Sequence, residues 1–375
     1  MAVLLFYACV SSQGQPEAHL TIPDIAERLT VAQGGYFPRM LLLKDGEILL
    51  TCKTGAPHVG KASRASMARS RDGGRTWSTP ITVFDIPDAL DSTDALGALR
   101  DGTLLFAAFS SKWEGADPHP DYESRKEYRT DTYVIRSRDK GFTWDSPIKV
   151  NTSPYTWAAP FGRIVSLPDG TILLSCYGGY LPLAGEHSPI KPENQRGTFC
   201  FLLRSRDAGK TWRGLSLIAR HYNETTLLRL PGNKLLAVMR SADEDKHLAT
   251  SFSLDQGYTW TAPKQVTSRS EHPGDLLLLA DGRILLTFGV RHKPFGVQAM
   301  ISRDNGESWD SRHRFVLAWD GDHGDLGYPI SVQRSDGRIV TAYYVVYGPY
   351  DPFGIKGIAP KNAYTKAVIW GLPKN

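Results

Sequence analysis

Four residues with chemically useful side chains stand at similar places in this sequence, beside short apolar runs. Glu224 opens and Arg240 ends the two runs of "NETTLLRLPGNKLLAVMR". Arg291 leaves a run in "LLTFGVRHKPFG" in the same way, and Tyr328 enters one in "GDLGYPISVQRSDGRIV". An arginine fork binds a carboxylate through two charge-assisted hydrogen bonds, and a carboxylate can take the proton of a nearby hydroxyl. These residue types suit an anionic ligand and proton transfer.

The elements that must position these residues are marked by a repeated motif. The frame Ser-x-Asp-x-Gly-x-Thr/Ser-Trp occurs five times, with its aspartates at Asp72, Asp139, Asp207, Asp255 and Asp304. Repeats separated by roughly 50 to 70 residues indicate a structural array. The motif suits a β-turn, because the carboxylate can accept turn N–H groups, the glycine can take positive φ and the tryptophan can pin the turn to a neighbouring strand.

A second repeat alternates with the first. Six segments of the type "KDGEILL" read as two-residue hairpin turns between apolar strands, at Asp45, Asp101, Asp169, Gly232, Asp281 and Asp336. The first five are each followed by a motif of the first kind. A hairpin plus the strand pair around that motif makes four strands, which is one propeller blade. The sequence therefore predicts an all-β, six-bladed β-propeller. We expect "HLTIPDIAERL" to supply the outer strand of the last blade, so that the ring closes by pairing the chain ends.

Composition excludes several other functions. The 375 residues are 41% hydrophobic and 22% charged, and the net charge of +5 is scattered without a basic run, so we expect no nucleic-acid partner. The four cysteines lack metal-ligand spacing, and we expect neither metal nor cofactor. No segment after the N-terminus approaches the roughly 20 apolar residues of a membrane span. The composition does not indicate an oligomeric state.

The N-terminus carries a separate signal. Residues 1–15, "MAVLLFYACVSSQGQ", resemble the apolar part of a signal peptide without its basic start, or else form a plain N-terminal extension. Residues 16–375 then form a single propeller domain. The signal reading places the protein outside the cell or in the periplasm, and the extension reading places it in the cytoplasm.

Five such motifs on a six-hairpin period resemble the sialidase (neuraminidase) superfamily, whose BNR or Asp-box repeats build six-bladed propellers. The resemblance covers the chain from about Gly34 onward. It implies a site of three arginines, a tyrosine with a partner glutamate, and an acid/base aspartate. Carried onto this sequence, it makes Tyr328 the nucleophile, Glu224 its base, and Arg240 and Arg291 the second and third arginines. A neutral nucleophile suits a substrate whose own carboxylate repels anions.

Two parts of the pattern depart from the resemblance. Sialidases begin their first strand with Tyr/Phe-Arg-Ile-Pro, whereas this chain has "YFPRM", so that Arg39 follows Pro38. A shift of two residues keeps a side chain on the same face of a strand, and Arg39 remains a candidate. Arg163 stands the same number of residues before its hairpin aspartate and is a rival pocket arginine.

The acid/base aspartate is missing. The loop "CKTGAPHVGKASRASMARS" contains no Asp or Glu, and His58 is its one residue of the type that titrates near neutral pH. Asp94 or Asp91 could also approach from the next blade, so the general acid is His58 or one of these aspartates.

The resemblance implies an exo-acting glycoside hydrolase that releases a terminal sialic acid-like sugar from glycans by a retaining Tyr/Glu mechanism. One alternative is a hydrolase or lyase of the same fold that acts on a uronate-linked sugar, such as rhamnose-glucuronate, through histidine. Another is a non-catalytic glycan-binding propeller that uses the arginines with Tyr36, Trp157 and Tyr180.

Overall fold

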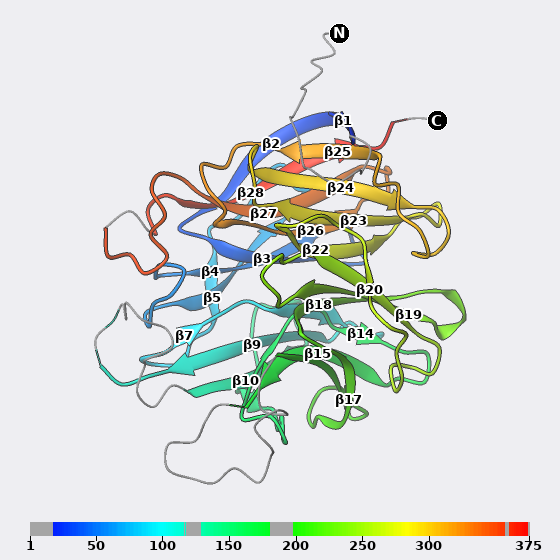
Figure 1. Ribbon diagram of the computed structural model, residues 1–375. Coiled ribbons are helices and arrows are strands. Elements are labelled where there is room, and N and C mark those ends of the chain that lie inside the picture. The colour runs from blue at the N-terminus through cyan, green and yellow to red at the C-terminus, as the bar shows by residue number, and fades with distance from the viewer. Residues whose placement is uncertain (1–17, 116, 118–128, 181–197, 357–359, 374–375) are drawn as a thin grey trace.

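The computed structural model describes residues 18–115, 117, 129–180, 198–356 and 360–373. Residues 1–15, with the signal-like segment, lie outside the described residues. Six sheets surround one axis, which confirms the predicted six-bladed propeller (Figure 1). Blade one contains β3 (Tyr36–Leu42), β4 (Ile48–Thr54), β5 (Arg64–Ser70) and β6 (Ile81–Phe84). Blade two contains β7 (Leu90–Asp91), β8 (Ala95–Ala98), β9 (Leu104–Lys112), β10 (Arg129–Ser137) and β11 (Ile148–Lys149), with β13 (Gly162–Arg163) paired to β8.

The remaining four blades follow in chain order. Blade three contains β12 (Trp157–Pro160), β14 (Val165–Ser166), β15 (Ile172–Gly179), β16 (Phe199–Ser205) and β17 (Arg213–Arg220). Blade four contains β18 (Tyr222–Arg229), a short 3-10 turn at Pro231–Asn233, β19 (Leu235–Ser241), β20 (Leu248–Ser253) and β21 (Lys264–Gln265). Blade five contains β22 (Glu271–Leu278), β23 (Ile284–Val290), β24 (Gly296–Ser302), β25 (His313–Ala318) and the added β1 (His19–Thr21). Blade six contains β26 (Leu326–Gln333), β27 (Ile339–Val346), β28 (Ala363–Gly371) and β2 (Asp24–Gln33).

The ring closes between the two ends of the chain, as predicted. Strand β2 pairs antiparallel with β28, and Leu29 lies opposite Ala367. In Figure 1 the blue β2 and the red β28 lie side by side. The closing strand also contributes Val31 and Ala32 to the apolar cluster between blades six and one.

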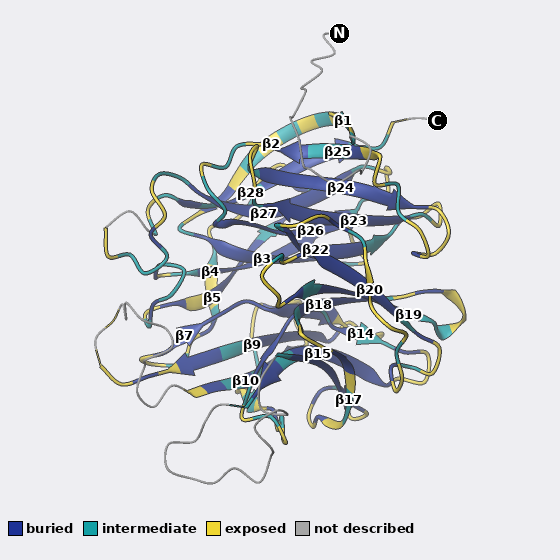
Figure 2. Cartoon of the chain, in the orientation of Figure 1, coloured by how far each residue is buried: buried dark blue, intermediate teal, exposed yellow. Residues whose placement is uncertain are grey.

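Each blade packs its faces against its two neighbours, so the central strands are buried on both sides. Figure 2 shows these strands in dark blue, whereas the turns at the rim are exposed. Strand β23 is buried along its whole length. This double burial explains why the sequence of such strands is a continuous apolar run rather than an alternating one.

The hairpin turns hold three residues, not the predicted two. In blade one the amide of Leu43 donates to the carbonyl of Glu47 at 2.8 Å, and the amide of Gly46 donates to the carbonyl of Leu43 at 3.0 Å. Gly46 has φ of 89°. This is the three-residue hairpin in which the last turn residue takes the left-handed conformation, and that position is where a glycine is favoured.

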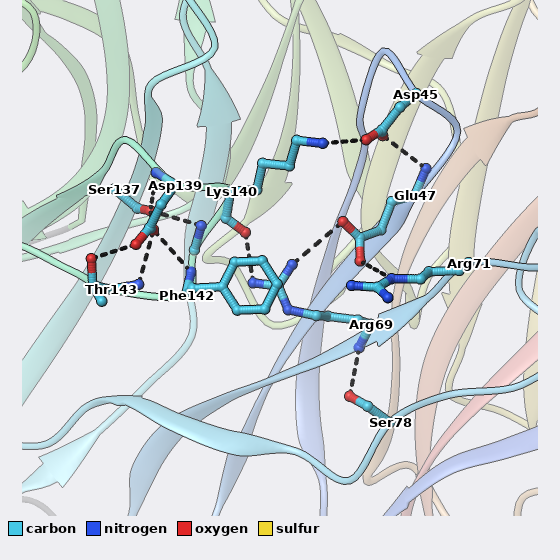
Figure 3. A network of polar contacts seen from close by, with 11 residues as sticks. Asp45, Glu47, Arg69, Arg71, Ser78, Ser137, Asp139, Lys140, Phe142 and Thr143 are labelled. Carbon is cyan, nitrogen blue, oxygen red and sulfur yellow. Dashed lines mark hydrogen bonds and ion pairs between the residues drawn. The ribbon is translucent and has the colours of Figure 1, made fainter.

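The eight-residue motif forms the turn that its residue types predict. The carboxylate of Asp139 accepts the amides of Phe142 and Thr143 at 3.0 and 2.9 Å and the Thr143 hydroxyl at 2.6 Å (Figure 3). At the other four motifs the aspartate likewise accepts the amide and the hydroxyl of the threonine or serine four residues later. Hydrogen bonds from the Thr259 hydroxyl and amide lower the pKa of Asp255 to about 2.

Each motif also packs against the preceding blade. Arg69 of β5 donates to the carbonyl of Lys140 at 2.6 Å and lies 3.9 Å from the Phe142 ring centroid (Figure 3). A Cβ atom at Gly257 would lie 2.5 Å from Leu202 of the preceding blade. Blade six lacks the motif because its third and fourth strands, β28 and β2, belong to opposite ends of the chain.

Candidate active site

Four of the innermost strands are distorted at similar places near their starts. The register of β3 on β4 shifts between Tyr36 and Arg39, and that of β26 on β27 shifts between Gly327 and Ile330. Strands β18 and β22 shift in the same way. Phe37 and Tyr328 both have φ of 50°, a left-handed conformation that bulky residues rarely take. Bulges re-aim side chains beside active sites, and strained backbone of this kind gathers at functional sites.

The bulge in β26 brings Tyr328 to Glu224 of β18, as the resemblance implies. The hydroxyl of Tyr328 donates to Oε1 of Glu224, 104 residues away in the sequence. Burial raises the pKa of Tyr328, and the neighbouring Glu224 carboxylate raises it further. Burial pulls the pKa of Glu224 upward, but Arg240 and the Tyr328 hydroxyl outweigh it and hold the pKa below its usual value. Glu224 is therefore ionised and placed to accept the Tyr328 proton.

Three arginines surround this pair. Arg240 donates to Oε2 of Glu224 at 2.7 Å. The guanidinium carbons of Arg291 and Arg39 lie 5.5 and 5.8 Å from the Tyr328 ring centroid. Each arginine also has a buried guanidinium nitrogen without a partner among the described residues: NH2 of Arg39, Nε of Arg240 and Nε of Arg291. Buried donors are costly to leave unpaired, so the cluster suits an anionic ligand.

Aromatic rings that the sequence analysis did not single out surround Tyr328. Phe37 and Tyr344 lie 4.8 and 5.7 Å from its ring centroid, and Phe161 lies at 5.9 Å. Phe161 also stacks on the guanidinium of Arg39 at 4.1 Å. These residues come from blades one, three and six, and nothing in their local sequence marks them for the site.

His58 lies beside the same aromatic wall. Its ring centroid is 4.8 Å from that of Phe37, and its Nδ1 is 2.9 Å from Oδ1 of Asp325. Asp325 also accepts the hydroxyl of Tyr344 at 2.6 Å. The sequence analysis missed Asp325, although a carboxylate three residues before Tyr328 was a signal that could have found it.

Asp94 lies close to Arg39 but deeper in the protein. Nε of Arg39 donates to the backbone carbonyl of Asp94 at 2.6 Å. Burial raises the pKa of Asp94 to about 7, against the lowering effect of Arg39. Asp91 is fully buried, and its carboxylate accepts the amide of Ile86 at 2.6 Å, which gives it a structural partner.

Arg163 occupies a different environment from the other arginines. Its guanidinium forms a fork with Asp275 at 3.0 and 2.6 Å and also donates to the carbonyl of Ser331 at 2.7 Å. These contacts join β13 to blades five and six near the axis. The proposed ligand-binding aromatic Tyr36 is fully buried, so its ring has no surface to offer a sugar.

Among the described residues, no group of three or more His, Cys, Asp or Glu side chains is placed to hold a metal ion. Within the same described ranges, no helix is long and apolar enough to cross a membrane.

The sequence model of the BNR repeat-like domain matches residues 121–341, more than half of the chain. A sialidase of Clostridium perfringens is 24% identical over 242 residues, which are 60% of this chain and 59% of that protein. A sialidase of Bacteroides fragilis is 22% identical over 290 residues, 67% of this chain and 49% of that protein. The chain thus spans about half to three fifths of these relatives.

Solved structures show the same propeller. A protein of unknown function from Dyadobacter fermentans has a TM-score of 0.76 and 25% identity, with 93% of this chain and 99% of that chain covered. The Hadza microbial sialidase Hz136 has a TM-score of 0.63 and 18% identity, with 90% and 66% covered. The chain belongs to the BNR repeat-like domain family, and its six-bladed ring is a propeller of the sialidase superfamily.

Proposed function

We propose that this protein is an exo-acting glycoside hydrolase that releases a terminal carboxylate-bearing sugar, of sialic acid type, with retention of configuration. Residues 16–375 act as one catalytic propeller in this proposal. The observation that carries it is the hydrogen bond from Tyr328 to an ionised Glu224 among three arginines with unpaired buried donors. Membership of the BNR family and the sialidase relatives support it.

Each residue has a role that its surroundings suit. Arg39, Arg240 and Arg291 hold the sugar carboxylate, because each has a buried guanidinium nitrogen without a partner among the described residues, and a carboxylate accepts such donors. Glu224 takes the proton of Tyr328 as the phenolic oxygen attacks the anomeric carbon. A tyrosine with a raised pKa needs such a base. In the same step an acid protonates the leaving oxygen, and we favour His58 over Asp94 for this role because the His58 side chain is 29% exposed whereas Asp94 is buried.

The test is release of fluorophore from a 4-methylumbelliferyl sialoside. We expect the full chain to turn the substrate over, and we expect Tyr328→Phe and Glu224→Gln each to lower kcat/KM by at least about 10³-fold, since they remove the nucleophile and its base. Tyr258→Phe is the matched control, because Tyr258 is half-exposed on the motif of blade four. Full turnover by Tyr328→Phe would exclude the tyrosine mechanism.

The histidine in the blade-one loop favours a second candidate, a uronate-linked sugar as substrate. The arginines would hold a uronate carboxylate by the same fork geometry. A folded wild-type protein that ignores the sialoside but cleaves a glucuronate-linked rhamnoside would support this candidate. Binding of either sugar in calorimetry without any turnover would instead indicate a glycan-binding propeller.

A further inference from the structure

We propose that Asp325 is a positioning residue for His58, and that the two residues act as a pair to protonate the leaving oxygen. The inference rests on the proposed function and deepens it. His58 lies in the loop between β4 and β5 of blade one, and Asp325 directly precedes β26 of blade six. The 2.9 Å contact between Nδ1 and Oδ1 therefore joins blade one to blade six, the blade in which the ring closes.

The partner of His58 is held as a buried anion. The side chain of Asp325 is 4% exposed, whereas that of His58 is 29% exposed. Burial raises the pKa of Asp325, but His58 and the Tyr344 hydroxyl outweigh burial and lower it to about 2. An ionised carboxylate at Nδ1 keeps a proton on that nitrogen and orients the ring, which leaves Nε2 as the nitrogen that donates to the leaving oxygen. No described residue bonds to Nε2 of His58.

The loop that carries His58 is anchored on both sides of it. Lys53 of β4 is fully buried, and its ammonium donates to the carbonyl of Ala56 at 3.4 Å and to that of Pro57. The amide of Val59 donates to the carbonyl of Pro352 at 2.9 Å. A ring fixed at its base and oriented at Nδ1 is a rigid proton donor.

Charged and titratable groups surround the His58–Asp325 pair and enter the pH dependence of that pair. The ring centroid of Tyr36 on β3 lies 6.0 Å from that of His58. Tyr344 on β27 and Arg291 after β23 act on Asp325, and Lys53 on β4 also interacts with Asp325. Asp351, between β27 and β28, interacts with Tyr36.

Asp94 is the rival proton donor, and its contacts argue against it. Its carboxylate accepts the Ser92 hydroxyl at 3.2 Å and the Phe109 amide at 3.0 Å, and the residue is 4% exposed. Both carboxylate oxygens are thus engaged inside the protein. A general acid must reach the leaving oxygen directly or through one water, which the exposed edge of His58 allows.

The proton balance closes over both half-reactions. Tyr328 attacks the anomeric carbon and gives its proton to Glu224, while the glycosidic C–O bond breaks and the leaving oxygen takes the Nε2 proton of the His58 imidazolium. Neutral His58 then takes a proton from the water that attacks the anomeric carbon. The Tyr328 oxygen departs and recovers its proton from Glu224.

The experiment compares two leaving groups in Asp325→Asn. A sugar alcohol needs protonation to leave, whereas the methylumbelliferyl phenol leaves readily without it. We expect kcat/KM for 3′-sialyllactose to fall about 10²- to 10⁴-fold and that for the aryl sialoside by less than about tenfold. We expect the basic limb of the pH–rate profile to shift as well. Asp322→Asn is the control, because Asp322 is exposed on the same loop and the amide oxygen can still accept the Gly348 N–H.

Several outcomes would overturn the proposal. Equal losses on both substrates, with an unmoved pH profile, would mean that Asp325 is merely structural. A leaving-group-dependent loss in Asp94→Asn but not in Asp325→Asn would assign the acid to Asp94.

A folded wild-type protein that hydrolyses neither sialoside would count against the proposed function. The contact between His58 and Asp325 can then be tested by a measurement that does not depend on activity. Nitrogen-15 shifts of the His58 imidazole at alkaline pH report its tautomer, assigned with His58→Gln. We expect the Nδ1–H form in the wild type and its loss in Asp325→Asn. The same tautomer in both proteins would refute the pairing.

Discussion

At the scale of the residue, burial raises the pKa of Asp94, and this makes the stability of the folded protein depend on pH. The pKa of Asp94 is raised to about 7, so the folded protein binds a proton that the unfolded chain has already released above about pH 4. Folding stability is therefore lost as pH rises from about 4 to 7. We expect Asp94→Asn, which never ionises, to gain melting temperature relative to the wild type between pH 5 and pH 8. A difference that stays constant across this range would contradict the raised pKa.

The residues of the site divide into those that sequence can and cannot reveal. Glu224, Arg240 and Tyr328 are recognisable because each stands at the start or end of a strand beside a hairpin turn, as in the sialidase segments that these stretches resemble. Phe37 is not, because its importance arises from contacts between blades. Asp325 has one local signal, its place three residues before Tyr328, but its partner is a histidine 267 residues away. Local sequence also gives no sign that bulky residues such as Phe37 and Tyr328 adopt a left-handed backbone.

At the scale of the element, the repeated motif is a folding device rather than a catalytic one. The carboxylate of Asp207 accepts the Thr211 amide at 2.9 Å and its hydroxyl at 2.7 Å. We expect Asp207→Ala to lower the free energy of unfolding by about 1 to 3 kcal/mol and to leave kcat/KM per folded molecule unchanged. Thr211→Val, which keeps the amide contact, should lose less. Denaturant titration beside active-site counting separates the two effects, and lost activity at full stability would place the motif in the reaction.

The hairpin turns show the limit of reading elements from sequence. Five Asp-Gly pairs and one Gly-Asn pair located the six hairpins closely enough to count the blades, yet the pattern suggests a two-residue turn. The structure instead has three turn residues, since Leu43 pairs with Glu47. A single added residue reverses which face a side chain takes, so the turn type matters for every position counted from it.

At the scale of the whole molecule, the ring depends on one strand that the chain itself contributes from its other end. Without β2, the backbone edge of β28 would be bare, and the cluster between blades six and one would lose Val31 and Ala32. Strand edges with unpaired backbone groups pair with other chains.

We expect deletion through Gln33 to abolish cooperative unfolding and to produce oligomers, as measured by circular dichroism and light scattering. Of the described strands, deletion through Ile22 removes β1 alone, which pairs with β25 over three residues, and it should cost far less. A synthetic peptide of residues 22–34 should restore the monomer, because it supplies the missing edge; a cooperative, monomeric protein lacking β2 would show that the remaining strands close the ring without it.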